Sequence, residues 1–136
     1  MKVNIFTYCD FAAENGNKLS ITGASHMIYV PDIPARVTCF IVGKIIIERE
    51  DEGDHLLDST IRDADGRVVC QCPRQQLTAR AFLELPQECE VYFHCMIHHV
   101  TFQLYKYGEY VLELRDNGQI LVSTVLMVAR LDTKSA

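Results

Sequence analysis

The side chains most able to do chemistry in this chain are cysteines and histidines that lie close together in the sequence. The run His94-Cys95-Met96-Ile97-His98-His99 follows Cys70-Gln71-Cys72 and Cys89. Thiolates and imidazoles are ligands that zinc prefers, so this stretch has the atoms of a metal-binding or redox module. Its candidate ligands are Cys70, Cys72, His94, Cys95 and His98.

The spacing of these residues does not favour a metal site. On a strand, His94 and His98 share a face but lie roughly 13 Å apart, whereas Cys70 and Cys72 share a face about 6.6 Å apart. The chain has no second Cys-x-Cys or Cys-x-x-Cys pair that would complete a cage of four ligands. We therefore predict no metal and no other cofactor, and we interpret the thiols as small buried hydrophobes and the histidines as rim or interface residues.

The sequence argues against two other kinds of site. A Cys-dependent hydrolase needs an activated thiolate, but the sequence has no Gly-x-Ser-x-Gly elbow and little predicted helix to lower a thiol pKa. The run Asp63-Ala64-Asp65-Gly66 begins like a calcium loop but continues Arg67-Val68-Val69-Cys70, without the later carboxylates. We predict a hairpin turn there, and no catalytic residues.

Composition and charge limit the possible partners. The 136 residues are 49% hydrophobic, which is enough to form the hydrophobic core of one domain. We expect this domain over residues 1–131 and a flexible tail at 132–136. Thirteen basic and eighteen acidic residues give a net charge of −5, which disfavours nucleic acid and anionic membranes as partners. No apolar run reaches the length of a membrane helix, and the first ten residues lack signal-peptide features, so we expect a cytoplasmic protein with reduced thiols.

The negative charge is concentrated in one region. Eight acidic residues and two arginines lie between Glu48 and Asp65, a local balance of −6, which leaves +1 for the other residues. A run of this kind is usually a solvated loop, and we expect this region to be exposed. The alternative is a docking edge for a basic partner.

The elements that must position these residues are strands. Clusters of Gly, Pro, Asn and Asp recur at short intervals between segments rich in Val, Ile, Thr, Tyr and Phe. The strongest signal is a C-terminal hairpin, with arms at Tyr107–Arg115 and Gln119–Leu131 and an Asn117-Gly118 turn. A second hairpin is predicted with arms at Asp54–Asp63 and Arg67–Cys72.

These elements predict an all-β fold: a single two-sheet antiparallel β-sandwich of about eight strands. At most one short helical turn is expected, near residues 75–86. The long apolar segments Val37–Glu48 and Val91–Leu104 show little alternation, which indicates strands deep in the sheets. In the segment Ile120–Leu131, Ile120, Val122, Leu126 and Val128 are expected on one face and Leu121, Val125, Met127 and Ala129 on the other. Because both faces are apolar, this strand is predicted to be covered or to meet a partner.

Three stretches carry a resemblance to a known group of proteins. They are Tyr8-Cys9-Asp10 followed by Gly16–Gly23, His55-Leu56-Leu57 leading to Ile61–Gly66, and Gly108-Glu109-Tyr110 leading to Leu114–Gly118. In this order they resemble a large family of uncharacterised bacterial single-domain β-sandwich proteins of unknown function. The resemblance implies a sandwich fold and no activity, and the Cys and His density between Cys70 and His99 departs from the family pattern.

The sequence as a whole favours a non-enzymatic binding or assembly module. Apolar residues on both faces of Ile120–Leu131 and in Val91–Leu104 exceed what one sandwich interior requires. We therefore expect a protein partner or self-association, as a homodimer or small oligomer, through sheet faces or edges. The Cys/His module and a phage structural accessory protein are the alternatives.

Overall fold

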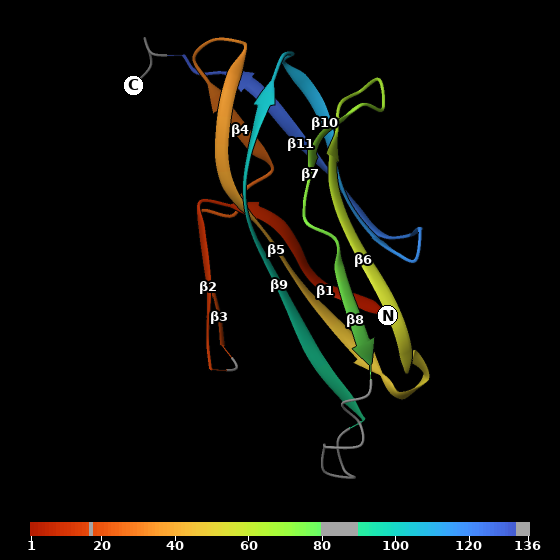
Figure 1. The fold of residues 1–136 in the computed structure, drawn as a ribbon. Helices are drawn as coiled ribbons and strands as arrows, with labels where there is room; N and C mark the ends of the chain where they lie inside the picture. Colours follow the sequence, from red (N-terminus) through yellow and green to blue (C-terminus); the bar gives the residue numbers. More distant parts are fainter. Residues whose placement is uncertain (17, 80–89, 133–136) are drawn as a thin grey trace.

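The chain folds as strands in three antiparallel or mixed sheets. A computed structural model describes residues 1–16, 18–79 and 90–132, and within them it has eleven strands and one 3-10 turn (Figure 1). The strands are β1 (Lys2–Cys9), β2 (Phe11–Asn15), β3 (Lys18–Thr22), β4 (Met27–Val30), β5 (Ala35–Glu48), β6 (Gly53–Arg62), β7 (Val68–Gln71), β8 (Gln75–Ala79), β9 (Val91–Leu104), β10 (Gly108–Asp116) and β11 (Gln119–Arg130); the turn is η1 (Arg49–Asp51). The prediction of an all-β fold is confirmed. The prediction of about eight strands in two sheets was wrong, because the described residues form eleven strands in three sheets.

The smaller main sheet has the order β1-β5-β9, with both pairs antiparallel. Strand β5 lies at its centre, as its apolar sequence predicted. Its pairing with β9 runs without interruption from Ala35 opposite Leu104 to Glu48 opposite Val91. The second long apolar segment, β9, is an edge strand, so its predicted place deep in a sheet was wrong.

The larger main sheet has six strands in the order β4-β11-β10-β6-β7, with β8 also pairing with β6. The pair β4 and β11 is parallel, from Met27 opposite Met127 to Val30 opposite Arg130, which corrects the prediction of a purely antiparallel fold. Residues 75–79 form β8 and not a helical turn, while residues 80–86 lie outside the described chain. Buried and more exposed residues alternate along β10. Its face with Tyr110, Leu112 and Leu114 is buried and packs on the core.

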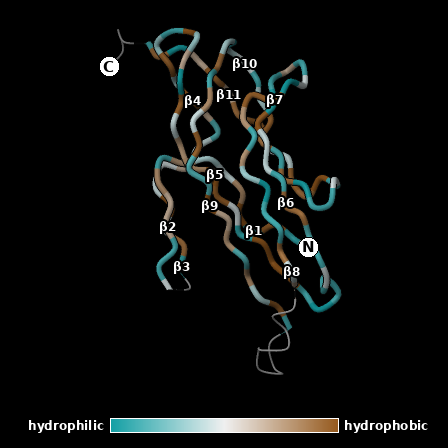
Figure 2. Tube along the Cα trace, viewed as in Figure 1, coloured by the Kyte–Doolittle hydropathy of each residue, from teal (hydrophilic) through white to brown (hydrophobic). Residues whose placement is uncertain are grey.

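The core lies between the two main sheets in two clusters. One contains Ile41 of β5, Phe102 of β9 and Leu112 of β10, and the other contains Ile45, Leu57, Met96 and Leu114. Loops at the ends of the strands are mainly hydrophilic (Figure 2). Burial of the apolar side chains in these two clusters is the principal favourable term that holds the sheets together.

A third, two-stranded sheet covers part of the outer face of the smaller main sheet. The hairpin β2-β3 places Ala12 against Cys9 and Val42, all nearly inaccessible, with Leu19 and Ile21 packed around them. Val42 belongs to the face of β5 that points away from the larger sheet, so this hairpin gives the smaller sheet a second buried face. That second face accounts for the apolar residues on both faces of β5.

Both predicted hairpins are confirmed. In β10-β11, Asp116 pairs with Gln119, and the intervening Asn117 and Gly118 have φ of 49° and 84°. Positive φ at both central positions is what a type I′ turn requires. In β6-β7, Asp63 caps the turn, because its Oδ1 accepts the backbone N–H groups of Asp65 and Arg67, each at 2.9 Å. The carboxylate that resembled the start of a calcium loop is thus used by the turn.

A bulge in β11 changes the predicted faces of that strand. Leu114 pairs with Val122 and Arg115 pairs with Ile120, so Leu121 is an extra residue. Because side chains alternate along a strand, one extra residue moves Ile120 to the opposite face from the one predicted. Ile120 is exposed, whereas Leu126 and Val128 are buried as expected.

Candidate functional site

The structure does not bring the five candidate metal ligands together. Cys70 and Cys72 are buried in the larger core cluster on the same side of β7, as their spacing predicted. His94 and His98 have the parity of Met96 and Val100 and share the inner face of β9, whereas Cys95 lies on the outer face near Glu14 and Lys44. Among the described residues no group of three or more His, Cys, Asp or Glu side chains has metal-site geometry. Cys89 lies outside the described residues.

The thiols of the described cysteines are mostly held in the neutral form. Burial raises the pKa of Cys39 to about 12, and burial with the nearby Glu14 raises the pKa of Cys95 to about 11. The hydrogen bond between the two thiols, followed by burial, raises the pKa of Cys72, and the same hydrogen bond lowers the pKa of Cys70. Thiols of this kind behave as small apolar side chains and not as nucleophiles.

The most unusual feature of the fold is the free edge of β9. This strand has 14 residues and lies at the end of the smaller main sheet, and no described strand pairs with its far side. Its sequence, Val91 to Leu104, contains no Asp, Glu, Lys, Arg, Pro or Gly, and its pairing with β5 contains no bulge. Phe93, on the outer face of this strand, is 52% exposed. A long, regular, uncharged edge is a template for pairing with another strand.

The other edges of the two main sheets all carry features that prevent such pairing. Strand β1 begins with Lys2 and has a register shift between Val3 and Ile5. Strands β4, β7 and β8 have only four or five residues each, Pro31 follows β4 directly, and a bulge interrupts the β6-β7 pairing. Short length, lysine, proline and bulges are the usual means of protecting an edge. Strand β9 has none of them.

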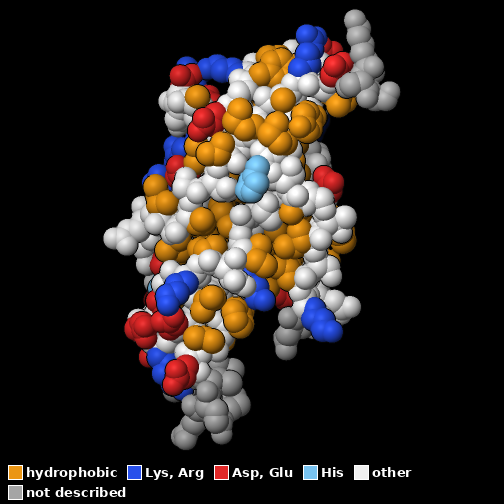
Figure 3. Space-filling model, turned by 180° about the vertical axis from the view of Figure 1, so that it is seen from behind, with side chains coloured by type: hydrophobic (Ala, Val, Ile, Leu, Met, Phe, Trp, Pro, Cys, Tyr) orange, Lys and Arg blue, Asp and Glu red, His pale blue; other side chains and the backbone are white. Residues whose placement is uncertain are grey.

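A second exposed apolar surface lies on the outer face of the larger sheet. Met127 and Val125 of β11 are 38% and 44% exposed, and Tyr29 of the neighbouring β4 is 58% exposed. Seen from behind, hydrophobic side chains gather over the middle and upper part of the molecule, with most charged side chains around its margins (Figure 3). The two apolar faces predicted for Ile120–Leu131 are therefore one buried face and one open face.

The acidic region is only partly exposed. Glu50, Glu52, Asp54 and Asp65 are exposed as predicted, but Glu48, Asp51, Asp58 and Asp63 are half-buried and take part in hydrogen-bond or ion-pair networks within the fold. His55 is at the centre of one such network: its Nδ1 lies 2.8 Å from Asp116 Oδ2 and its Nε2 lies 2.5 Å from the Asp51 carbonyl oxygen. Both partners accept hydrogen bonds, so both ring nitrogens are satisfied only when each carries a proton. Burial lowers the pKa of His55, but the Asp51 carbonyl and the Asp116 carboxylate outweigh it and raise the pKa above 6.5.

This network predicts a specific pH dependence of stability. Because the folded pKa is raised, the contribution of His55 is complete below its ordinary pKa near 6.5 and is lost as the pH rises through the folded value. His55→Gln is expected to cost about 1–3 kcal/mol in free energy of unfolding at mildly acidic pH, and less at alkaline pH. Urea unfolding of His55→Gln and wild type from mildly acidic to alkaline pH measures this difference in free energy of unfolding. His26→Gln, at an exposed position, is the control, and an unchanged difference between His55→Gln and wild type at every pH would contradict the assignment.

Comparisons with known proteins identify the family and no activity. The model of a family of unknown function (DUF6941) matches residues 4–129, so the chain belongs to that family. No curated protein matches the chain. Among solved structures, the Pseudomonas fluorescens alkylpurine DNA glycosylase AlkC bound to DNA containing an abasic site analog aligns with a TM-score of 0.44 and 10% identity. The alignment covers 93% of this chain and 30% of the glycosylase chain, and a likeness this weak carries no argument about function.

The described residues contain no helix that is long and apolar enough to cross a membrane.

Sequence reasoning missed the edge position of β9 because an apolar segment without alternation is also typical of a central strand. The absence of charge and proline over Val91–Leu104 was readable in the sequence, but it acquires meaning only when the strand is known to lie at an edge.

Proposed function

We propose that this protein is a non-enzymatic binding and assembly module that pairs through the edge of β9, and that its partner is a second copy of the same chain. The observation that supports the proposal is the contrast between β9 and the other edges of the two main sheets. We place the module in the bacterial cytoplasm, where its thiols stay reduced.

A second copy suits this edge for a reason of charge. Antiparallel pairing of two identical strands brings like residues near each other across a two-fold axis, and like charges there would repel. The segment Val91–Leu104 has no formal charge apart from its histidines, and burial lowers the pKa of His94 and His98, which keeps them neutral at pH 7.

The first half of β9 is the part best suited to pairing. Strand β7 lies beside the other end, where Val68 and Val69 line a pocket together with Gln103 and Tyr105. Pairing of the first half of β9 with its copy, centred on Cys95, would join two three-stranded sheets into one of six strands. A two-fold axis perpendicular to that sheet keeps like faces together, so Phe93, Cys95 and Ile97 would meet the same residues of the second copy.

Light scattering after size-exclusion chromatography tests this proposal. At tens of micromolar the wild-type protein is expected to have twice the 15.5 kDa mass of one chain. Phe93→Glu is expected to be monomeric, because it places a charge on the pairing edge. The variant is expected to fold, because the new carboxylate lies near Lys44, whose Nζ is 4.7 Å from the Phe93 ring centre in the wild type. Circular dichroism checks that this variant is folded.

The matched control is Val125→Glu on the outer face of β11. It introduces the same charge at a similarly exposed apolar position, and we expect it to remain dimeric. If Val125→Glu is monomeric while Phe93→Glu is dimeric, association uses the open face of β4 and β11 and the β9 proposal is wrong. A wild-type monomer at these concentrations would also overturn it.

A further inference from the structure

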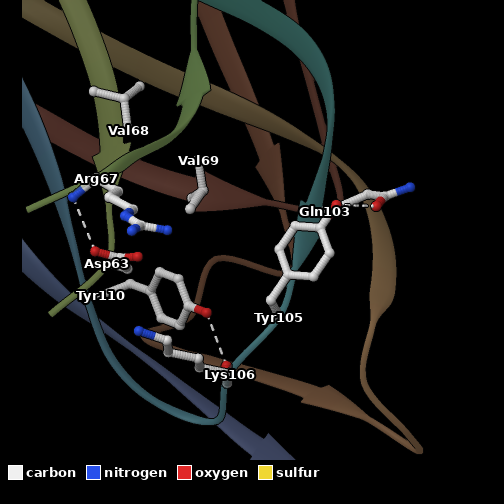
Figure 4. Close-up of a pocket in the computed structure, with 8 residues that line it drawn as sticks. All are labelled: Asp63, Arg67, Val68, Val69, Gln103, Tyr105, Lys106 and Tyr110. Atoms are coloured by element: carbon white, nitrogen blue, oxygen red, sulfur yellow. Dashed lines mark hydrogen bonds between the residues drawn. The ribbon is translucent and has the colours of Figure 1, made fainter. Parts of the chain in front are cut away.

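A pocket lies between the β6-β7 turn and the C-terminal end of β9, away from the half of β9 that is proposed to pair. Its volume is about 370 Å³, in the range of small-ligand sites. Figure 4 shows the Arg67 and Tyr105 side chains on opposite sides of this space, with Val69 above and Lys106 below. The lining contains both polar and apolar side chains. Its other residues are Asp63, Val68, Gln103 and Tyr110.

The walls of the pocket are held in place by interactions within the fold. The buried Tyr110 ring forms part of the floor, and its hydroxyl donates to the Lys106 carbonyl at 2.8 Å. Asp63 caps the β6-β7 turn through Oδ1, as described above, and the Tyr105 hydroxyl donates to Gln103 Oε1 at 2.6 Å. The floor and the turn side of the pocket are therefore formed before any ligand binds, which lowers part of the entropic cost of binding.

The charged groups of the pocket leave one donor uncommitted. Lys106 is paired with Asp65, and Asp63 is used by the turn. The Arg67 guanidinium makes no hydrogen bond or ion pair with another described side chain, although it lies near enough to Asp65 and Lys106 to affect both pKa values. A guanidinium presents a planar fork of donors that matches a carboxylate in two parallel hydrogen bonds.

The opposite wall supplies flat apolar surface. Tyr105 is 63% exposed, and Val69 adds aliphatic surface between it and Arg67, whereas Val68 lies on the Arg67 side (Figure 4). Aromatic rings bind other rings by offset or edge-to-face contact. Arg67 and Tyr105 face each other across a space that takes a single ring with a short acidic arm. We propose that this pocket binds a small aromatic carboxylate, with its carboxylate on Arg67 and its ring against Tyr105 and Val69.

Titration of the isotope-labelled protein with 4-hydroxyphenylacetate, followed by amide chemical shifts, tests the proposal. Saturable shifts are expected at Val68, Val69 and Gln103. The neutral amide of the same compound keeps the ring and loses the charge, so it is expected to bind about tenfold more weakly or worse. Arg67→Gln is expected to weaken binding of the acid by a similar factor and to leave binding of the amide unchanged, and Tyr105→Ala is expected to weaken both.

The control is Arg74→Gln. Arg74 is an exposed arginine that follows β7, its Nε lies 3.7 Å from Asp58 Oδ2, and it does not line the pocket. It is expected to bind the acid as the wild type does. Shifts that do not saturate, equal binding of acid and amide, or undiminished binding by Arg67→Gln would overturn the proposal. Arg67→Gln is expected to keep the oligomeric state of the wild type, so failure here is distinguishable from failure of β9 pairing.

Discussion

Val42→Asp is expected to destabilise the protein by about 3 kcal/mol or more, because it places a charge in a site closed to water. Val42 is inaccessible on the outer face of β5, where Ala12 of the β2-β3 hairpin covers it. A two-sheet sandwich would leave this face of β5 open. The size of the effect therefore reports whether the hairpin forms a third layer, and urea unfolding monitored by circular dichroism measures it.

Thr38→Asp is the matched control for this substitution. Thr38 is on the same strand and the same face as Val42 but is exposed, beyond the cover of the hairpin, where its hydroxyl meets that of Thr101 at 2.9 Å. We expect a cost of about 0.5 kcal/mol, as for ordinary surface positions. Equal costs for the two variants would show that the hairpin does not pack on this face.

Leu112→Ala is expected to cost about 2–5 kcal/mol, from lost burial and the cavity left behind. Leu112 is fully buried in the middle of β10, which has β6 on one side and β11 on the other, and belongs to the same core cluster as Ile41 of the opposite sheet. Because β10 is paired on both sides, its backbone has little freedom to move into the space that the truncation leaves. The free energy of unfolding from chemical denaturation is the readout.

Val125→Ala provides the comparison on the opposite face of the same sheet. Val125 is 44% exposed, so its truncation is expected to cost about 0.5 kcal/mol. If Leu112→Ala were no more costly than Val125→Ala, the assignment of inner and outer faces in this sheet would be wrong.

Local sequence chemistry was sufficient to predict the two hairpins. Asn117 and Gly118 adopt positive φ with little strain, and this local preference sets the turn and the pairing of β10 with β11. The buried face of β10 followed from strict alternation, which needs no knowledge of the rest of the chain. Asp63 likewise fixes its turn with its own side chain.

Contacts between distant segments explain what could not be predicted. The parallel pairing of Met27–Val30 with β11 joins segments about a hundred residues apart, and no turn marks it. The bulge at Leu121 reverses the face of Ile120 without any Gly or Pro at that point. The edge position of β9 depends on the topology of the whole sheet, so the candidate pairing site became visible only in the fold.

The pocket was also beyond sequence reasoning. Arg67 and Tyr105 are 38 positions apart and each looks like an ordinary surface residue in a turn region. The β6-β7 turn and the end of β9 come together only because the two main sheets pack face to face.

Hydrogen exchange of backbone amides at increasing protein concentration tests pairing through β9 most directly, because it reports on the edge residue by residue. Amides within Val91–His98 are expected to become more protected as concentration rises through the range in which the dimer forms, while those of the protected edge β1 stay unchanged. Phe93→Glu is expected to abolish the concentration dependence. Exchange within Val91–His98 that is the same at every concentration, or a concentration dependence confined to β4 and β11, would show that the chain does not pair through β9.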